Sequence, residues 1–175
     1  MVEQRTENPC VPGSIPGGTT REPALSRLSL NIKKSFMKHA VKTTWKGNMA
    51  FDSEVNGHHI TIDASDEFGG NNLGPRPKEL MLTSIAGCSG MDVVSMLKKM
   101  QVELKDFQIY IEADLTEEHP KHYSRMHIIY EFHGKDLPLD KLQKAVDLSQ
   151  EKYCGVSYMY KKAFEVTYEI KNENS

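Results

Sequence analysis

Residues 75–100, PRPKELMLTSIAGCSGMDVVSMLKKM, contain the longest uninterrupted helix pattern in the chain. Pro77 suits a first helical turn, where its missing N–H would be unpaired anyway, and Lys98 and Lys99 suit the last turn, where carbonyls point outward. The apolar residues between them cover more than one helical face, whereas a surface helix keeps them on one stripe. We therefore expect a central helix that is buried on most sides.

The middle of this helix, residues 86–90, has the unusual sequence AGCSG. Each glycine in a helix interior costs roughly 1 kcal/mol relative to alanine. Small residues allow another helix or a substrate to approach closely, and they leave the thiol of Cys88 unscreened. Cys88 is then either a small buried hydrophobe in a tight helix crossing or a thiol that takes part in chemistry.

The composition sets limits on the possible functions. A chain of 175 residues with 38% hydrophobic residues has material for one core of ordinary size. The formal net charge of −2 gives no basic surplus for nucleic acid, and no run of about 18 apolar residues predicts a membrane span. Three cysteines without a CxxC pair fit neither a disulfide framework nor a zinc ribbon. They suit a reducing compartment, where thiols stay free, so we expect a cytoplasmic protein.

Residues 1–36 differ from the rest of the chain. This polar stretch is rich in proline and glycine and shows neither strand nor helix periodicity, so it cannot build a core. We expect a poorly structured extension that comes from a mis-assigned start or from cloning, with Cys10 chemically incidental. Residues 37–175 are expected to form a single domain.

The order of elements in this domain predicts an α+β fold. Alternating residues and the hairpin signal Asn56-Gly57 indicate a strand meander over residues 40–62. After the central helix we expect strands at 107–116 and 125–133, a second helix from Pro138 to about Tyr153, a short helical segment at 156–163 and a strand at 164–170. Such an order favours helices packed on one face of a mostly antiparallel sheet.

A second cysteine, Cys154 in EKYCGVS, also has small neighbours at a predicted helix end. If the two thiols meet, a thiolate at one can attack a peroxide, become a sulfenic acid and be captured by the other as a disulfide. Cys88 lies about three turns inside its helix, beyond the reach of the helix dipole, so its activation requires a neighbouring group. Cys154, next to a possible helix start, is better placed for help from a dipole.

Both cysteine neighbourhoods, GPRPKELMLTSIAGCSGMDVV and LSQEKYCGVS, resemble the OsmC/Ohr family of organic hydroperoxide reductases, most closely its YhfA-like branch. The resemblance covers the chain from about Met37. It implies an intertwined homodimer with sites at the subunit interface, no metal or haem cofactor, and reduction by a dithiol such as a lipoyl group. It also implies that Cys88 attacks an organic hydroperoxide and that Cys154 resolves the sulfenic acid.

The sequence departs from that family at one position. The family peroxidases have a Glu ten residues before the first cysteine, paired with an Arg from an early strand, whereas this chain has Lys78 there and no early-strand Arg. Glu79 is one residue away and points about 100° around the helix. Glu79 is therefore a candidate for tuning the thiol, but the family's Arg–carboxylate pair is missing.

Asp92, the histidines and three tyrosines are further candidates for a functional site. Asp92, four residues after Cys88, lies on the same helix face and either accepts a hydrogen bond near the thiol or is a satisfied buried group. The seven histidines lack HxxxH spacing, so we expect them at the surface rather than at a metal. Three tyrosines either line an apolar pocket or pack in the core, and packing is favoured: Tyr153, Tyr158 and Tyr160.

Two hypotheses follow for the function. The first is a thiol-dependent organic hydroperoxide reductase. The alternative is a non-enzymatic module of the same fold that binds an apolar ligand or partner and whose cysteines are structural or redox-sensing.

Overall fold

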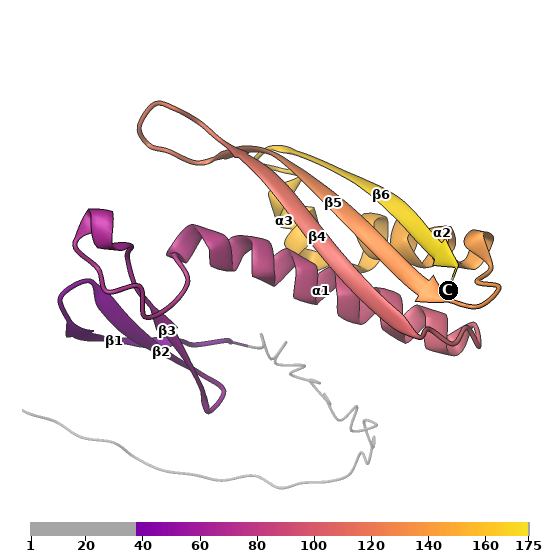
Figure 1. Ribbon diagram of the computed structural model, residues 1–175, viewed down its shortest axis with the longest axis horizontal. Helices are drawn as coiled ribbons and strands as arrows, with labels where there is room; N and C mark the ends of the chain where they lie inside the picture. Colours follow the sequence, from indigo (N-terminus) through magenta and orange to yellow (C-terminus); the bar gives the residue numbers. More distant parts are fainter. Residues whose placement is uncertain (1–37, 175) are drawn as a thin grey trace, which may run out of the picture. The chain divides into compact units, whose positions relative to one another are not determined.

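The long helix predicted from residues 75–100 is helix α1 (Pro77–Lys99). The structure is a computed structural model that describes residues 38–174, shown in Figure 1. Pro77 opens α1, the carboxylate of Glu79 accepts a bond from the N–H of Arg76 at 3.0 Å, and Lys98 and Lys99 end the helix. The expectations for residues 1–36, Cys10 among them, lie outside the described residues.

Strands β1 (Lys42–Gly47), β2 (Ala50–Val55) and β3 (His58–Ile62) form an antiparallel meander in that order. Asn56 and Gly57 have φ angles of 51° and 79° in the turn between β2 and β3. Two positive φ angles in a two-residue loop fit the twist of a hairpin, so the predicted turn is confirmed.

The loop between β3 and α1 is organised by Asp63, which is 2% exposed. Its carboxylate accepts bonds from the backbone N–H groups of Ala64, Asn71 and Leu73 at 2.8–3.2 Å. Burial alone would raise the pKa of Asp63, but these three donors and the charge of Arg76 hold it below its usual value. Asp63 is therefore an ionised anchor for the chain as it enters α1.

A second sheet has the order β4-β5-β6, with β4 (Asp106–Leu115), β5 (Tyr123–Gly134) and β6 (Glu165–Asn174). β4 pairs with β5 in antiparallel orientation, and β6 pairs with β5 in parallel. A parallel neighbour requires a crossover connection, which the helices between β5 and β6 provide. The prediction of a mostly antiparallel α+β fold holds, since three of the four strand pairings within residues 38–174 are antiparallel, but the strands form two sheets instead of one.

The helices pack on one face of this second sheet (Figure 1). Alternate residues of β5 point into the core between the sheet and the helices, and all of them are fully buried: Met126, Ile128, Tyr130 and Phe132. Phe107 of β4 stacks on Phe132 with ring centroids 4.6 Å apart. From α1, Ile85, Val93 and Leu97 enter the same core.

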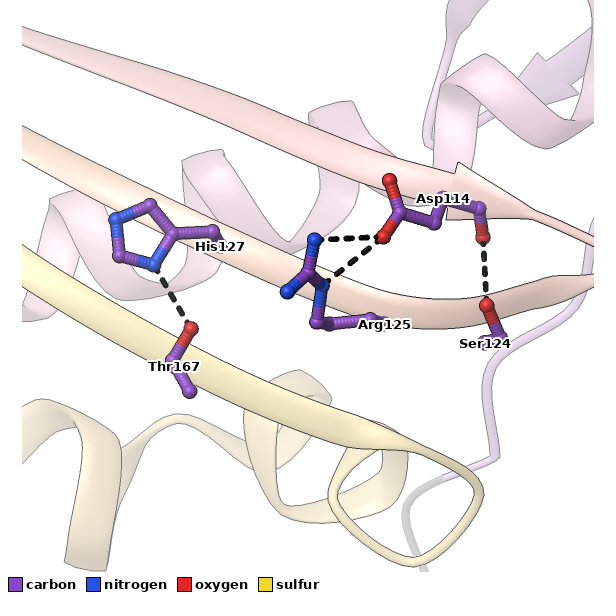
Figure 2. Close-up of polar contacts among 5 residues, drawn as sticks. All are labelled: Asp114, Ser124, Arg125, His127 and Thr167. Carbon is purple, nitrogen blue, oxygen red and sulfur yellow. Dashed lines mark hydrogen bonds and ion pairs between the residues drawn. The ribbon is translucent and has the colours of Figure 1, made fainter.

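Figure 2 shows polar contacts on the opposite face of this sheet. Arg125 pairs with the carboxylate of Asp114 at 2.9 Å, and the imidazole of His127 contacts the hydroxyl of Thr167 at 2.8 Å. Arg125 and Asp114 are register partners whose neighbours Met126 and Ala113 face the core. This Arg–carboxylate pair therefore lies on the wrong side of the sheet to serve a cysteine of α1.

The second predicted helix differs from the structure at its end. Helix α2 (Leu139–Leu148) is followed by a π-helical turn (Ser149–Tyr153) and then by α3 (Gly155–Tyr160). In the π turn the N–H of Cys154 donates to the carbonyl of Ser149 at 2.8 Å, a bond that spans five residues. Such a turn holds one more residue than an α-helical turn and commonly marks a functional site.

Candidate functional site

Cys88 lies in the middle of α1, where it is partly exposed. Gly90 allows strand β4 to approach closely, because a Cβ there would lie 2.8 Å from the Cδ1 of Ile109. Gly87 has open space around it. The small residues beside Cys88 therefore serve close packing on one side and leave the helix surface accessible on the other.

Cys154 is the N-cap of α3 and is 3% exposed. The extended backbone at Cys154, with φ −71° and ψ 100°, turns its side chain toward the first turn of that helix. There the thiol sulfur accepts a bond from the N–H of Ser157 at 3.3 Å. The π turn before Cys154 and the short helix after it together fix the position of the sulfur.

The structure brings these two thiols together with a carboxylate. Sγ of Cys88, Sγ of Cys154 and a carboxylate oxygen of Asp92 all lie within 4.8 Å of one another. Asp92 reaches the cluster because residues four apart share a helix face, and the packing of α1 on α3 supplies Cys154. Three of the four predicted site residues thus meet, Cys88 and Asp92 from α1 and Cys154 from a segment far away in the sequence.

Burial is the largest cause that raises the pKa of the Cys154 thiol to about 11; the neighbouring Cys88 contributes to this rise, and the N–H of Ser157 opposes it. At neutral pH Cys154 is therefore protonated. The sequence had favoured Cys154 for help from a helix start. That interaction is present, but desolvation outweighs it.

A buried hydrogen-bond network supports Cys154, and the sequence did not predict it. The hydroxyl of Ser157 donates to Oε1 of Gln150 at 2.5 Å, and Nε2 of Gln150 donates to the hydroxyl of Tyr130 at 2.6 Å. Burial also raises the pKa of Tyr130. All three side chains are at most 3% exposed, so they tie the cap of α3 to the core strand β5. The only sequence signal was the presence of Ser and Gln close to the cysteine in LSQEKYCGVS.

Asp92 does not belong to this network and has a different hydrogen-bond partner, Ser149. The hydroxyl of Ser149, which is fully buried, lies 3.3 Å from Oδ2 of Asp92 and 3.4 Å from the carbonyl oxygen of Ser89. Ser149 donates its single proton to one of these acceptors at a time. The π turn therefore positions Asp92 as well as Cys154.

Glu79 does not join the cluster. It is exposed and occupied in capping the N-terminus of α1. Nine residues of helix, about 13.5 Å at 1.5 Å per residue, separate it from Cys88. Lys78, at the position of the family's Glu, donates to the carbonyl of Lys121 at 3.2 Å.

The tyrosines predicted to pack in the core behave differently from one another. Tyr160 is partly buried and donates to the carbonyl of Met81 at 3.1 Å, whereas Tyr153 and Tyr158 are more than half exposed. Tyr153 lines a hollow of about 330 Å³ that shares Asp92 with the cluster and is otherwise formed mainly by Met96, Met100 and Leu148. The preference for packing is thus wrong for Tyr153 and Tyr158, and the pocket alternative applies to Tyr153.

The chain is similar in sequence and in fold to known proteins. Residues 69–169 match the family model described as OsmC-like protein. The chain is 32% identical over 128 residues to the protein YhfA of Escherichia coli strain K12, a match covering 73% of this chain and 92% of that protein. Among solved structures it is similar to a hypothetical protein from Aquifex aeolicus VF5, with 34% identity, a TM-score of 0.67, and coverage of 79% and 99% of the two chains.

A more distant structural match is the organic hydroperoxide resistance protein OhrB of Bacillus subtilis. Its TM-score is 0.55 with 21% identity, and the match covers 75% of this chain and 98% of that one. At this level of identity the match indicates a shared fold.

Proposed function

Because the chain belongs to the family of OsmC-like proteins, we propose that it reduces organic hydroperoxides, with Cys88 attacking the peroxide and Cys154 resolving the product as a disulfide. The observation that carries this proposal is the approach of the two thiols to within 4.8 Å. They come from distant parts of the sequence, so the fold has to hold them together.

The surroundings of the thiols support this division of roles. Cys154 is buried, and its pKa of about 11 keeps it protonated, which makes it a poor first nucleophile. Cys88 is partly exposed and can meet a substrate. The neighbouring hollow has an apolar part, formed by Met96, Met100 and Leu148, that suits an organic group on the peroxide, and its other lining residues include Ser95 and Lys99.

The Cys88 thiolate attacks the terminal peroxide oxygen, the O–O bond breaks, and the alkoxide leaves as an alcohol after taking a proton, so that Cys88 becomes a sulfenic acid. The sulfur of Cys154 then attacks the sulfur of Cys88, and the hydroxyl group leaves with the Cys154 proton as water. Loss of the negative charge on Cys88 removes the coulombic effect by which Cys88 raises the pKa of Cys154. A dithiol, such as a lipoyl group, would reduce the disulfide by exchange and become a disulfide itself. This cycle suits a reducing compartment such as the cytoplasm.

The first prediction is a loss of two thiols. With Cys10 replaced by serine, reduced protein treated with cumene hydroperoxide should lose both remaining thiols, since oxidation at Cys88 ends in a disulfide with Cys154. Cleavage after lysine should then yield peptides 79–98 and 153–161 joined by a disulfide. We expect slow oxidation, because the family's Arg–carboxylate pair is missing. Two titratable thiols after prolonged treatment would contradict the proposal.

A second candidate function is the non-enzymatic module that binds an apolar ligand. The specific observation in its favour is that Glu79 caps the helix and Lys78 bonds a carbonyl, so neither assists Cys88. The same hollow beside Asp92 would then hold the ligand. Saturable binding of an apolar probe without consumption of hydroperoxide would favour this candidate.

We also propose that the protein acts as a homodimer. By length and composition α1 is apolar enough to span a bilayer, and it packs on α2, α3 and β4. Only 33% of its apolar stretch is buried, so the expected burial on most sides is not met within one chain. Its uncovered side still exposes Met91 and Val94, at 71% and 46%, above a shallow hollow that reaches Phe107 and Ile109. Such a contiguous apolar surface is typical of an interface.

The second prediction concerns this association. The protein should sediment as a dimer at micromolar concentration, and Met91→Glu should weaken the dimer by about tenfold or more, because it places a charge in an apolar contact. Leu139→Glu is the matched control, since Leu139 is 57% exposed at the start of α2. A monomeric mass for the unchanged protein would defeat the proposal.

A further inference from the structure

The cluster of Cys88, Asp92 and Cys154 has a composition that disulfide chemistry does not require. Two thiols suffice for a disulfide, yet a carboxylate lies within 4.8 Å of both sulfurs. Within residues 38–174 no ion pair involves Asp92, so no lysine or arginine balances its charge directly. The cluster therefore offers one carboxylate and two sulfur donors, a combination that a thiophilic cation can bind when it displaces the thiol protons.

We propose that the reduced protein binds a thiophilic divalent cation, Zn²⁺ in the first instance, through Cys88, Cys154 and Asp92. Two sulfur donors select zinc, cobalt or cadmium over magnesium and calcium, which prefer oxygen. Three protein ligands leave a fourth tetrahedral position for water or another small ligand, as in zinc sites that are not purely structural.

The geometry needs only a small adjustment. With Zn–S bonds of about 2.3 Å, two sulfurs of a tetrahedral site lie about 3.8 Å apart. The donors, already within 4.8 Å, would have to approach by about 1 Å or less. Rotation of the partly exposed Cys88 side chain can supply this movement, while Cys154 stays fixed by its cap.

The carboxylate also has the supporting contact expected of a ligand. Ser149 places its hydroxyl 3.3 Å from one oxygen of Asp92. Hydrogen bonds to the distal side of a ligand orient it and strengthen binding. Ser149 belongs to the π turn that positions Cys154, so one local feature sets both the carboxylate and the second sulfur.

Metal binding and disulfide formation exclude each other, because both use the same two sulfurs. The metal site stands independently of the reductase activity, since it needs only the reduced thiols. Protein oxidised to the disulfide therefore provides an internal control in which the same chain has lost both sulfur ligands.

The test is a cobalt titration of reduced protein that carries Cys10→Ser, under inert gas. One equivalent of Co²⁺ per subunit should produce thiolate-to-cobalt charge-transfer absorption and the visible bands of tetrahedral cobalt, and Zn²⁺ should remove both. Asp92→Asn, which keeps the shape of the side chain and both thiols, should weaken cobalt binding by at least about tenfold. Circular dichroism and thiol counts on each variant establish that the fold and the two sulfurs are intact.

Several results would overturn the metal site while leaving the reductase proposal open. They are absence of the charge-transfer band, its persistence in Cys88→Ser or in oxidised protein, and unchanged affinity in Asp92→Asn. Cobalt held only by histidines would lack the thiolate band, so the exposed pair His58 and His59 cannot imitate the expected result.

Discussion

Cys88→Ser is expected to reduce hydroperoxide consumption with a dithiol to the rate measured without protein. A serine hydroxyl stays protonated at neutral pH and is a weak nucleophile toward peroxide oxygen, and Cys154 cannot replace Cys88 because its pKa is about 11. The measurement is consumption of cumene hydroperoxide with dihydrolipoamide. The hydroxyl is close in size to the thiol, so the fold of α1 should persist.

Cys154→Ser is the matched control for this loss. Without added dithiol it should still consume one equivalent of peroxide and then stop, with Cys88 as a sulfenic acid that dimedone labels. If Cys88→Ser keeps most of the activity, another residue attacks the peroxide and the proposed roles are wrong.

Phe132→Ala is expected to lower the free energy of unfolding by about 3–5 kcal/mol. Phe132 is fully buried on β5 and stacks on Phe107 at 4.6 Å, so truncation leaves a cavity between the sheet and the helices and also removes an aromatic pair. For a protein of ordinary stability, about 5–15 kcal/mol, this loss is large. The melting temperature should fall by roughly 10–20 °C.

The control is Tyr110→Ala on the neighbouring strand, where the side chain is 49% exposed. Tyr110→Ala removes a ring of similar size but should lower the free energy of unfolding by no more than about 1 kcal/mol. Urea unfolding at one fixed protein concentration measures both variants, because association would shift apparent stability. Equal losses in the two variants would show that the core does not lie where the structure has it.

The elements predicted well from the sequence are those whose signals are local. Helix α1 carries its own start and stop, Pro77 and the two lysines, and the structure keeps both. Asn56-Gly57 set the hairpin because few other residue pairs accept two positive φ angles. The approach of Cys88 and Cys154 was predicted from the chemistry of two thiols and from the family resemblance of their two sequence neighbourhoods. This prediction did not require knowledge of how the helices pack.

What the sequence did not predict depends on contacts between distant segments. Alternation along β4 would place Leu115 on the same face as Ile111 and Ala113, but the register shifts after Asp114 and Leu115 is 50% exposed. The bonds from Gln150 to Tyr130 and from Ser149 to Asp92 join residues that approach only when the helices pack. The pKa of Cys154 likewise follows from burial, which no local pattern around EKYCGVS reveals.

The π turn at Ser149–Tyr153 makes the candidate site sensitive to chain length as well as to residue type. Each helical residue turns the chain by about 100°, so removing one residue from this turn would restore an α-helical register and swing the next side chain to another face. Both cysteines would remain in the sequence, yet their sulfurs would no longer face each other. Relatives that keep both cysteines can therefore be sorted by counting residues between the end of the second helix and its cysteine. A shortened turn would mark a protein that has lost the paired site while still carrying its residues.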